Sequence, residues 1–507
     1  MRNKLLLPIL VLILFVNVTA QEKLPAFISD SLDAYVERAL KSWDIPGVSV
    51  CVVKDGKVVV MKGYGVREAG KNDKVDENTL FLIGSNTKAF TGTALAMLED
   101  EGKCSLSDKV QKYLPDFKMK DPWVAGHLNL LDIVSHRIGM ETFQGDFMYW
   151  DANLTPQEVI EKFGMLTPKY DFRTRWGYTN AGFVIAGECI RKISGGDWAS
   201  FVRDKIFSPL KMNSSLALLG EIPQAKNIAK SHTLVDGKLM VIPYPSVDHL
   251  APAGSISSSV SDMSHWLIAQ LDSGRYAGSQ VIPFSAIRKT RQPLSILGRT
   301  SNPYDRNPFS MYAMGWSIEN YRGHEIVSHT GGVDGFVTSV TLLPDEKLGI
   351  VVLTNNDNNG FYTSLKWEIV DAFLGQPYRN YDKYYFDFYK KKQVSDDEEL
   401  KALRDTVKMN PKPALDLDAF TGKYVHEAYG YINIAREGNT LVMTFEHHPT
   451  LRGKLESLGG SRFLCTYSDP VFGIRVLPFT VEDSKVKSMT LKVADFVEMT
   501  TYDFIKQ

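Results

Sequence analysis

The stretch FLIGSNTKAF, residues 81–90, decides how the rest of the sequence is interpreted. An apolar, strand-like run over residues 81–83 leads through a glycine into a helical pattern over residues 85–102. Ser85 and Lys88 stand three residues apart at the start of this helix, so their side chains share one face. The pair is either a capping serine beside a solvated lysine, or a nucleophile beside the group that takes its proton.

The setting of this pair favours the nucleophile interpretation. A serine becomes an effective nucleophile once a neighbouring group accepts its proton. The first turn of a helix adds free backbone N–H groups and a positive field, which stabilise negative charge on Ser85 and on an attacked carbonyl. The same Ser-x-x-Lys spacing recurs at Ser208 and Ser484, but there it falls in a loop-like stretch and in a charged turn.

The composition is that of a globular protein. The chain has 507 residues, of which 44% are hydrophobic and 23% are charged, with a formal net charge of -1. This length predicts two to three domains. The near-neutral charge argues against nucleic acid as the main partner, because phosphate binding needs a basic surface.

The first twenty residues have the pattern of an export signal. Arg2 and Lys4 precede an apolar run over residues 5–16, and small residues up to Ala20 offer a cleavage site before Gln21. That run is too short to span a bilayer, and no later run reaches about 20 apolar residues. We therefore expect an exported chain, periplasmic or secreted, with no transmembrane span after cleavage. An uncleaved N-terminal anchor is the alternative.

Neither the cysteines nor the histidines are spaced as metal ligands. The four cysteines are scattered along the chain, and the ten histidines include no H-E-x-x-H or comparable spacing. We expect no metal, no cofactor and no disulfide framework. Cys51 and Cys189 lie in apolar runs and are interpreted as core residues.

Strand patterns lie at both ends of the first 375 residues, with helical patterns between them. Residues 46–65 predict a hairpin that turns at Asp55 and Gly56, residues 105–285 are mostly helical, and short strands return from about residue 311. This order predicts an α+β domain. In it, an antiparallel sheet closed by distant segments is flanked by helices and carries an all-helical insertion.

The last part of the chain has a different pattern. Residues 377–413 are first aromatic and then charged, and we expect them to form a connector. Residues 414–507 contain short alternating strands with glycine turns, which predict a small all-β domain of barrel type. With the export signal at residues 1–20, the main domain is expected to cover residues 21–376.

Two further motifs suit the chemistry suggested by the serine and the lysine. In Tyr178-Thr179-Asn180, a tyrosine beside an ammonium can have a lowered pKa and act as base or relay, while the asparagine can hold the lysine and a substrate amide. The alternative is a helix cap with a packed aromatic. The stretch SHTGG, residues 328–332, is either a tight turn or a small-residue edge along which a substrate can lie.

The order S-x-x-K, Y-x-N and H-T-G resembles that of the serine β-lactamase and penicillin-binding superfamily, in its class C-like branch. The resemblance covers about residues 27–375. It includes SHRIGMETFQGD, residues 135–146, which is similar to the family's loop beside the site, with Ile138 where Thr or Ser is usual. The tail is similar to the small lipocalin-like domain that follows this domain in some peptidases that process D-amino acids.

The resemblance implies a β-lactamase/transpeptidase-like fold and a set of catalytic groups. Ser85 is expected to attack a carbonyl and form an acyl-enzyme, while Lys88 and Tyr178 manage its proton, with either of them as the base. The backbone N–H groups of Ser85 and Gly332 are expected to form the oxyanion hole.

The resemblance also implies substrate-binding residues. Asn180 is expected to orient both the lysine and a substrate amide. His329, Thr330 and Gly331 are expected to contact the leaving side of the substrate or its carboxylate. β-Lactamases of this branch usually have a lysine where this chain has His329, which is largely neutral at pH 7.

The expected function is hydrolysis of an amide or ester carbonyl in a small peptide or ester. Because the H-T-G form is more typical of peptidases than of β-lactamases, a peptidase or carboxypeptidase for D-amino-acid, cell-wall-type peptides is the first expectation. A carboxylesterase and a weak β-lactamase are alternatives, and a catalytically silent penicillin-binding or sensor protein is the alternative of another class. The sequence predicts neither the substrate's stereochemistry nor an oligomeric state.

Overall fold

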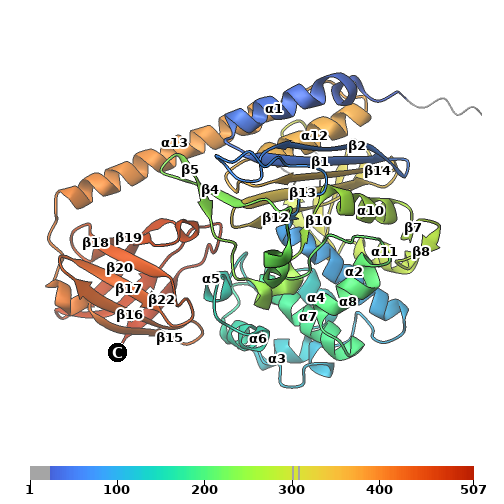
Figure 1. Ribbon diagram of the computed structural model, residues 1–507. Helices are drawn as coiled ribbons and strands as arrows, with labels where there is room; N and C mark the ends of the chain where they lie inside the picture. The colour runs from blue at the N-terminus through green and yellow to red at the C-terminus, as the bar shows by residue number, and fades with distance from the viewer. Residues whose placement is uncertain (1–22, 300–301, 306–308) are drawn as a thin grey trace, which may run out of the picture.

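An eight-stranded antiparallel sheet forms the centre of the larger part of the molecule (Figure 1). Its strands come from both ends of that part of the chain, as expected, in the order β2-β1-β14-β13-β12-β11-β10-β9. Their bounds are β1 Gly47–Lys54, β2 Lys57–Gly65, β9 Ser295–Arg299, β10 Phe309–Tyr312, β11 Ser317–Tyr321, β12 His324–Val333, β13 Phe336–Leu343 and β14 Leu348–Thr354. The hairpin turn at Asp55 and Gly56 is confirmed, with φ of 51° and 72°.

This computed structural model describes residues 23–299, 302–305 and 309–507. The expected export signal, residues 1–20, lies outside the described residues. Within those ranges, no helix combines the length and apolar character needed to cross a membrane.

Helices cover both faces of the sheet, which is why its central strands are apolar on both sides. Along β1, Val50 and Val52 face a core layer shared with α1 (Leu32–Ser42) and α12 (Phe361–Phe373). The alternate residues Cys51 and Val53 belong to a second layer shared with the helices of the other face. That face carries α10 (Val260–Leu271) and α2 (Thr87–Asp100).

The region expected to be an all-helical insertion is mostly helical but also contains short strands. Its helices are α3 Pro122–His127, α4 Leu130–Val134, α5 Asp146–Tyr149, α6 Pro156–Met165, α7 Asn180–Ser194, α8 Trp198–Val202, α9 Ala251–Gly254 and α11 Phe284–Thr290. A two-residue strand β3 (Phe81–Leu82) pairs with β6 (Ser257–Ser258), and β7 (Arg275–Tyr276) pairs with β8 (Ser279–Gln280). A longer hairpin, β4 (Ser231–Val235) and β5 (Lys238–Ile242), turns at Asp236-Gly237, the same turn signal that marks the first hairpin.

The segment expected to be a connector contains the longest helix of the described chain. Helix α13 (Tyr381–Lys408) has 28 residues and runs across the molecule toward the C-terminal part (Figure 1). Its second half is mostly polar but has a short apolar stripe of Leu400, Leu403 and Val407, and the mostly charged residues 390–399 separate this stripe from the aromatic first half. Lysine–aspartate pairs four residues apart, such as Lys392 with Asp396, favour the helix locally. Arg404 also bonds Asp236 in the turn of the β4–β5 hairpin.

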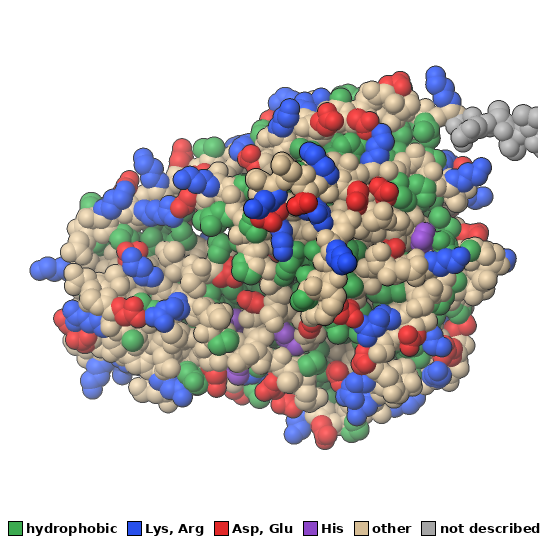
Figure 2. All heavy atoms as spheres, in the orientation of Figure 1, with side chains coloured by type: hydrophobic (Ala, Val, Ile, Leu, Met, Phe, Trp, Pro, Cys, Tyr) green, Lys and Arg blue, Asp and Glu red, His purple; other side chains and the backbone are tan. Residues whose placement is uncertain are grey.

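The C-terminal part is a closed eight-stranded barrel, which confirms the expected all-β domain. Its strands are β15 Gly422–His426, β16 Gly430–Glu437, β17 Thr440–Phe445, β18 Arg452–Ser457, β19 Arg462–Tyr467, β20 Ile474–Glu482, β21 Lys485–Leu491 and β22 Tyr502–Lys506. Aromatic side chains such as Phe463 and Phe479 fill its interior. On the face shown in Figure 2, basic and acidic side chains are interspersed, in keeping with the near-neutral charge.

Candidate active site

Ser85 lies on a short turn that is pressed against strand β12. The turn, Gly84–Asn86, is a 3-10 helix that leads directly into α2. Gly84 has φ of 53°, and a Cβ added there would lie 3.0 Å from the backbone nitrogen of Gly332. A Cβ added to Gly331 would lie 1.9 Å from the carbonyl oxygen of Ile83. Of the two alternatives for residues 328–332, the tight turn is wrong: these residues belong to strand β12, and their glycines let the backbone around Ser85 approach it.

Lys88 is fully buried directly behind Ser85. Its Nζ atom lies 3.0 Å from Ser85 Oγ, 2.7 Å from Asn180 Oδ1 and 2.7 Å from the carbonyl oxygen of Ala253. Both the amide oxygen and the carbonyl oxygen can only accept. A neutral amine gives its two N–H groups to these acceptors, so its lone pair faces the Ser85 hydroxyl.

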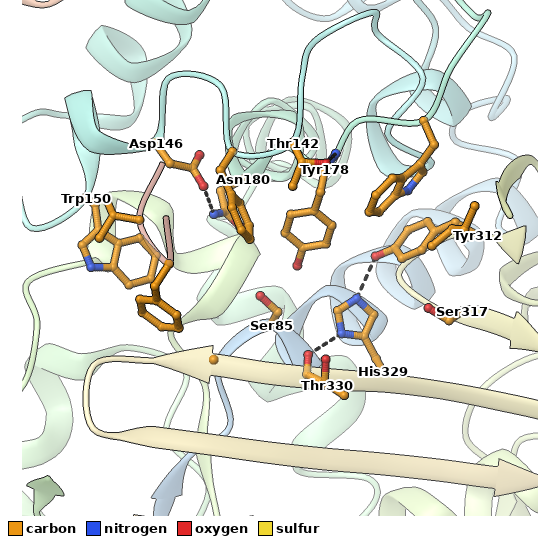
Figure 3. A pocket seen from close by; sticks show the side chains of 16 residues that line it. Ser85, Thr142, Asp146, Trp150, Tyr178, Asn180, Tyr312, Ser317, His329 and Thr330 are labelled. Atoms are coloured by element: carbon orange, nitrogen blue, oxygen red, sulfur yellow. Dashed lines mark hydrogen bonds between the residues drawn. The ribbon is translucent and has the colours of Figure 1, made fainter. Parts of the chain in front are cut away.

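Asp146 determines which atom of Asn180 faces the lysine. The Asn180 Nδ2 group donates to Asp146 Oδ2 at 2.6 Å, so the amide oxygen is turned toward Lys88 (Figure 3). Asp146 is itself buried, at 2% exposure. The three side chains therefore form one line, from carboxyl through amide to amine.

Burial moves the pKa values of Lys88 and Asp146, the two ends of this line, toward 7. Desolvation lowers the pKa of Lys88 to about 7, and the nearby Asp146 carboxylate opposes that shift. Desolvation likewise raises the pKa of Asp146 to about 7, opposed by the neighbouring Tyr149 hydroxyl, by the charge of Lys88 and by the hydrogen bond from Asn180. A lysine that is half neutral at pH 7 can accept the proton of a serine.

Tyr178 approaches the nucleophile from the other side. Its hydroxyl group and that of Ser85 point toward one another across the cavity (Figure 3). The expectation that the lysine lowers the pKa of this tyrosine is wrong: desolvation raises the pKa of Tyr178 above its ordinary value, and the nearby Ser85 hydroxyl opposes this only in part. Tyr178 therefore keeps its proton near neutral pH.

His329 uses both ring nitrogens within the protein. Nδ1 lies 2.6 Å from the carbonyl oxygen of Thr330, which can only accept, so Nδ1 carries the proton and Nε2 accepts from the Tyr312 hydroxyl at 2.8 Å (Figure 3). Desolvation and the charge of Lys88 lower the pKa of His329 to about 3. His329 is therefore neutral at physiological pH. The side chain of Thr330 is exposed toward the cavity, and Gly331 is buried against the Ser85 turn.

Most of these residues border one cavity of about 280 Å³, although Lys88 and Gly331 do not line it. Its lining is largely aromatic, and two residues come from the C-terminal barrel domain. The lining residues are Ser85, Thr142, Phe143, Asp146, Trp150, Trp176, Tyr178, Asn180, Leu297, Tyr312, Ser317, His329, Thr330, Gly332, Phe496 and Val497. None of these described lining residues is a lysine or an arginine.

The described ranges hold no group of three or more His, Cys, Asp or Glu side chains arranged to bind a metal. All four cysteines are buried and unpaired. Cys51 and Cys189 lie in the core, as expected.

Six of the eight expected site residues line this cavity, and the other two, Lys88 and Gly331, pack directly against the turn that carries Ser85; the roles of all eight stay predictions. Sequence reasoning missed Asp146, although the loop singled out at residues 135–146 ends on it. It also missed Tyr312, which has no motif around it. Phe496 and Val497 could not be assigned from sequence, because nothing local places the end of the barrel domain beside a serine more than 400 residues away.

Comparison with known proteins agrees with this geometry. The family model described as Beta-lactamase matches residues 32–373, and a domain of unknown function, DUF3471, matches residues 407–504. A protein of Aspergillus violaceofuscus named "Unguisins hydrolase ungD" is 30% identical over 440 residues, which cover 80% of this chain and 77% of that protein. "Protein flp" of Staphylococcus aureus strain MW2 is 28% identical over 330 residues, covering 64% and 62%.

Among solved structures, the octameric penicillin-binding protein homologue from Pyrococcus abyssi aligns with a TM-score of 0.59 at 21% identity, covering 94% of this chain and 99% of that one. It supports the fold of both parts of the chain. The family match extends over the segment that carries Ser85, Lys88, Tyr178 and His329. The chain is a serine hydrolase and belongs to the beta-lactamase family.

Proposed function

We propose that this hydrolase is a peptidase that cleaves amide bonds next to uncharged, apolar residues, without requiring a free carboxylate on the substrate. The observation that carries this proposal is the composition of the cavity: aromatic walls, a neutral His329 and no lysine or arginine among the described lining residues. The family resemblance adds D-amino-acid peptides as the first class to test.

The first chemical step follows from the lone pair of Lys88. Ser85 Oγ attacks the substrate carbonyl, and its proton passes to the Lys88 amine. As the bond between the carbonyl carbon and the leaving nitrogen breaks, that nitrogen takes a proton from the Tyr178 hydroxyl, which is replenished from the Lys88 ammonium. Lys88 is thus the base, and Tyr178 is a relay that stays protonated. Water then cleaves the ester on Ser85 by the reverse proton path.

The charge that develops on the carbonyl oxygen needs donors beside Ser85. We assign this role to the backbone N–H groups of Ser85 and Gly332, which the close approach of Gly84 to strand β12 brings near one another. Removing one such donor in other enzymes costs about 10²–10³ in rate.

The lack of a cation in the lining argues against a strict carboxypeptidase or an efficient β-lactamase. Both would have to hold a substrate carboxylate in the cavity, and an unpaired carboxylate is costly to bury. The Asp146 carboxyl group in the lining adds to that cost whenever it is ionised. An internal peptide bond or an ester avoids the problem.

The test compares N-acetyl dipeptides that differ only at their C-terminus, as the free acid or the amide, with an apolar residue of D or L configuration on the acyl side. We expect kcat/KM to be at least about tenfold higher for the amides. A preference for the free acids would contradict the proposal. The ratio of D to L substrates tests the stereochemical expectation separately.

A short-chain p-nitrophenyl ester and a fluorescent penicillin, followed by intact-mass measurement with Ser85→Ala as control, separate the alternatives. Turnover of the ester but of no peptide would indicate an esterase. A stable penicillin adduct on Ser85 without turnover of any substrate would indicate the silent penicillin-binding alternative.

We also propose that the chain is exported, on the strength of the pattern in residues 1–20. Expression of the full chain in a bacterial host, followed by N-terminal sequencing of the secreted or periplasmic fraction, should find Gln21 as the first residue. A product retained in the cytoplasm with its N-terminus intact would contradict this.

A further inference from the structure

Side chains of the barrel domain contact the turn that carries Asp146. Helix α5 is a single turn of four residues, too short to be stable by itself. The ring of Phe147, in the middle of this turn, stacks on His448 of the barrel domain at a centroid distance of 4.6 Å and meets the ring of Phe472 edge-on at 5.5 Å. The carbonyl oxygen of Phe147 also lies 2.9 Å from His448 Nε2.

Glu498, which follows the last cavity-lining residue of the barrel domain, binds the backbone of the same turn. One carboxylate oxygen accepts from the N–H of Gly145 at 2.7 Å, and the other accepts from the N–H of Phe147 at 3.0 Å. These two N–H groups flank Asp146 on either side in the chain. The Phe147 N–H belongs to the peptide group that directly follows Asp146, and the Gly145 N–H lies one peptide further back, so the two bonds from one carboxylate restrain the backbone on both sides of Asp146.

Glu498 is also hydrogen-bonded by two tyrosines of its own domain, the barrel domain. The hydroxyl groups of Tyr429 and Tyr502 donate to its two oxygens at 2.6 Å and 2.7 Å, and its exposure is 1%. Burial raises the pKa of this carboxyl group, while each of the four donors favours its ionised form. Burying a carboxylate is costly, and the four donors from two domains offset that cost only while both domains hold this arrangement.

We propose that Glu498 is a positioning residue for the hydrolase reaction: it fixes the turn that carries Asp146, and through Asp146 and Asn180 it aligns the Lys88 lone pair with Ser85. It touches neither the substrate nor the reacting atoms. The barrel domain is then part of the catalytic unit, because the amide that orients the lysine is set by a carboxylate that the barrel domain supplies.

The test is Glu498→Gln, which keeps the size of the side chain but replaces one acceptor oxygen with a donor. One backbone N–H of the α5 turn then loses its acceptor. The matched control is Glu427→Gln, which makes the same chemical change at an exposed ion pair between the barrel domain and Lys120. Thermal melting is recorded first, and all kinetics are measured well below both melting temperatures.

For Glu498→Gln we expect kcat for the p-nitrophenyl ester, and the rate of Ser85 labelling by a fluorophosphonate, to fall about 10- to 100-fold, with KM changed less than about threefold. Glu427→Gln should match the wild type in both. A purely structural role for Glu498 would lower the melting temperature and leave kcat unchanged, and that result would overturn the proposal.

Should Glu498→Gln fail to fold, the pair Tyr429→Phe and Tyr502→Phe takes its place. These changes leave the carboxylate with its two backbone donors and should lower kcat in the same direction by a smaller factor. Wild-type kcat in the folded double variant would equally refute the positioning role. Because the ester and the fluorophosphonate report only on Ser85 activation, these outcomes are independent of the peptide specificity proposed above.

Discussion

Replacing Asp146 with asparagine should move the acid limb of the pH profile to lower pH. Asparagine at this position keeps an oxygen that accepts from Asn180 Nδ2, so the amide of Asn180 can still turn its oxygen toward Lys88. What the change removes is a negative charge that holds the proton on the lysine. Without it, the pKa of Lys88 falls further below 7.

The size of the shift follows from the geometry. Hydrogen bonds of 2.7 Å and 2.6 Å on either side of one amide group separate the amine from the carboxylate. That places the two charges about 7 Å apart, where they interact by about 2 kcal/mol at an effective dielectric constant of 20. This energy corresponds to about 1.5 pKa units, so the limb should move from near pH 7 to about pH 5.5.

The assay is kcat/KM for the p-nitrophenyl ester between pH 4.5 and pH 9. In the wild type, activity at pH 6 should be about 10% of the plateau, because about that fraction of Lys88 is neutral; in Asp146→Asn it should be about 75%. Asp146 titrates in the same range, so the wild-type limb belongs to the pair rather than to one residue. In Asp146→Asn only Lys88 of this pair can titrate, so the limb of the variant reports the pKa of Lys88 alone.

The control is Asp116→Asn, which makes the same change at an exposed carboxylate of the same domain and should leave the limb in place. A limb that stays near pH 7 in Asp146→Asn, or that moves upward, would refute the assignment of Lys88 as the base. A flat wild-type profile between pH 5 and pH 8 would do the same.

Three further outcomes test the site. Ser85→Ala should lower kcat for the ester by more than about 10⁴-fold without changing the melting temperature, and residual turnover near wild type would remove Ser85 as the nucleophile. Gly331→Ala should destabilise the protein by about 1–3 kcal/mol in urea unfolding and lower kcat, because its Cβ would collide with the carbonyl oxygen of Ile83; wild-type stability would show that the contact is not tight. Phe496→Ala should raise kcat/KM for bulky acyl esters relative to acetyl esters, because this half-exposed ring lines the cavity and limits its width. An unchanged ratio would show that Phe496 does not limit the size of the acyl group.

The fold is predictable where local signals agree with the tertiary structure. The Asp55-Gly56 turn between two β-branched runs predicts the first hairpin, and glycine turns between short strands predict a barrel-type domain. The same signal at Asp236-Gly237 is harder to interpret, because its flanking strands are partly exposed and lie within a helical region. Helix α13 escapes prediction because the mostly charged residues 390–399 interrupt the helical spacing of its apolar residues.

The sequence by itself determined which groups can do chemistry. Ser85 and Lys88 meet because they stand three positions apart in one helical run, and that geometry is local. The identity of the remaining motif residues also follows from short patterns, each within a few residues of the chain. The class of reaction therefore follows from local patterns alone.

Tertiary structure decided the ionisation and the shape of the site. Desolvation depends on which atoms surround a group and not on its neighbours in sequence, so only the fold shows that the pKa of Lys88 lies near 7, that the pKa of His329 lies far below its ordinary value and that Tyr178 keeps its proton. The same holds for Glu498, which lies 352 positions after Asp146 in the chain and binds the backbone on both sides of it. Contacts of that separation are created by packing two domains together, and no local pattern encodes them.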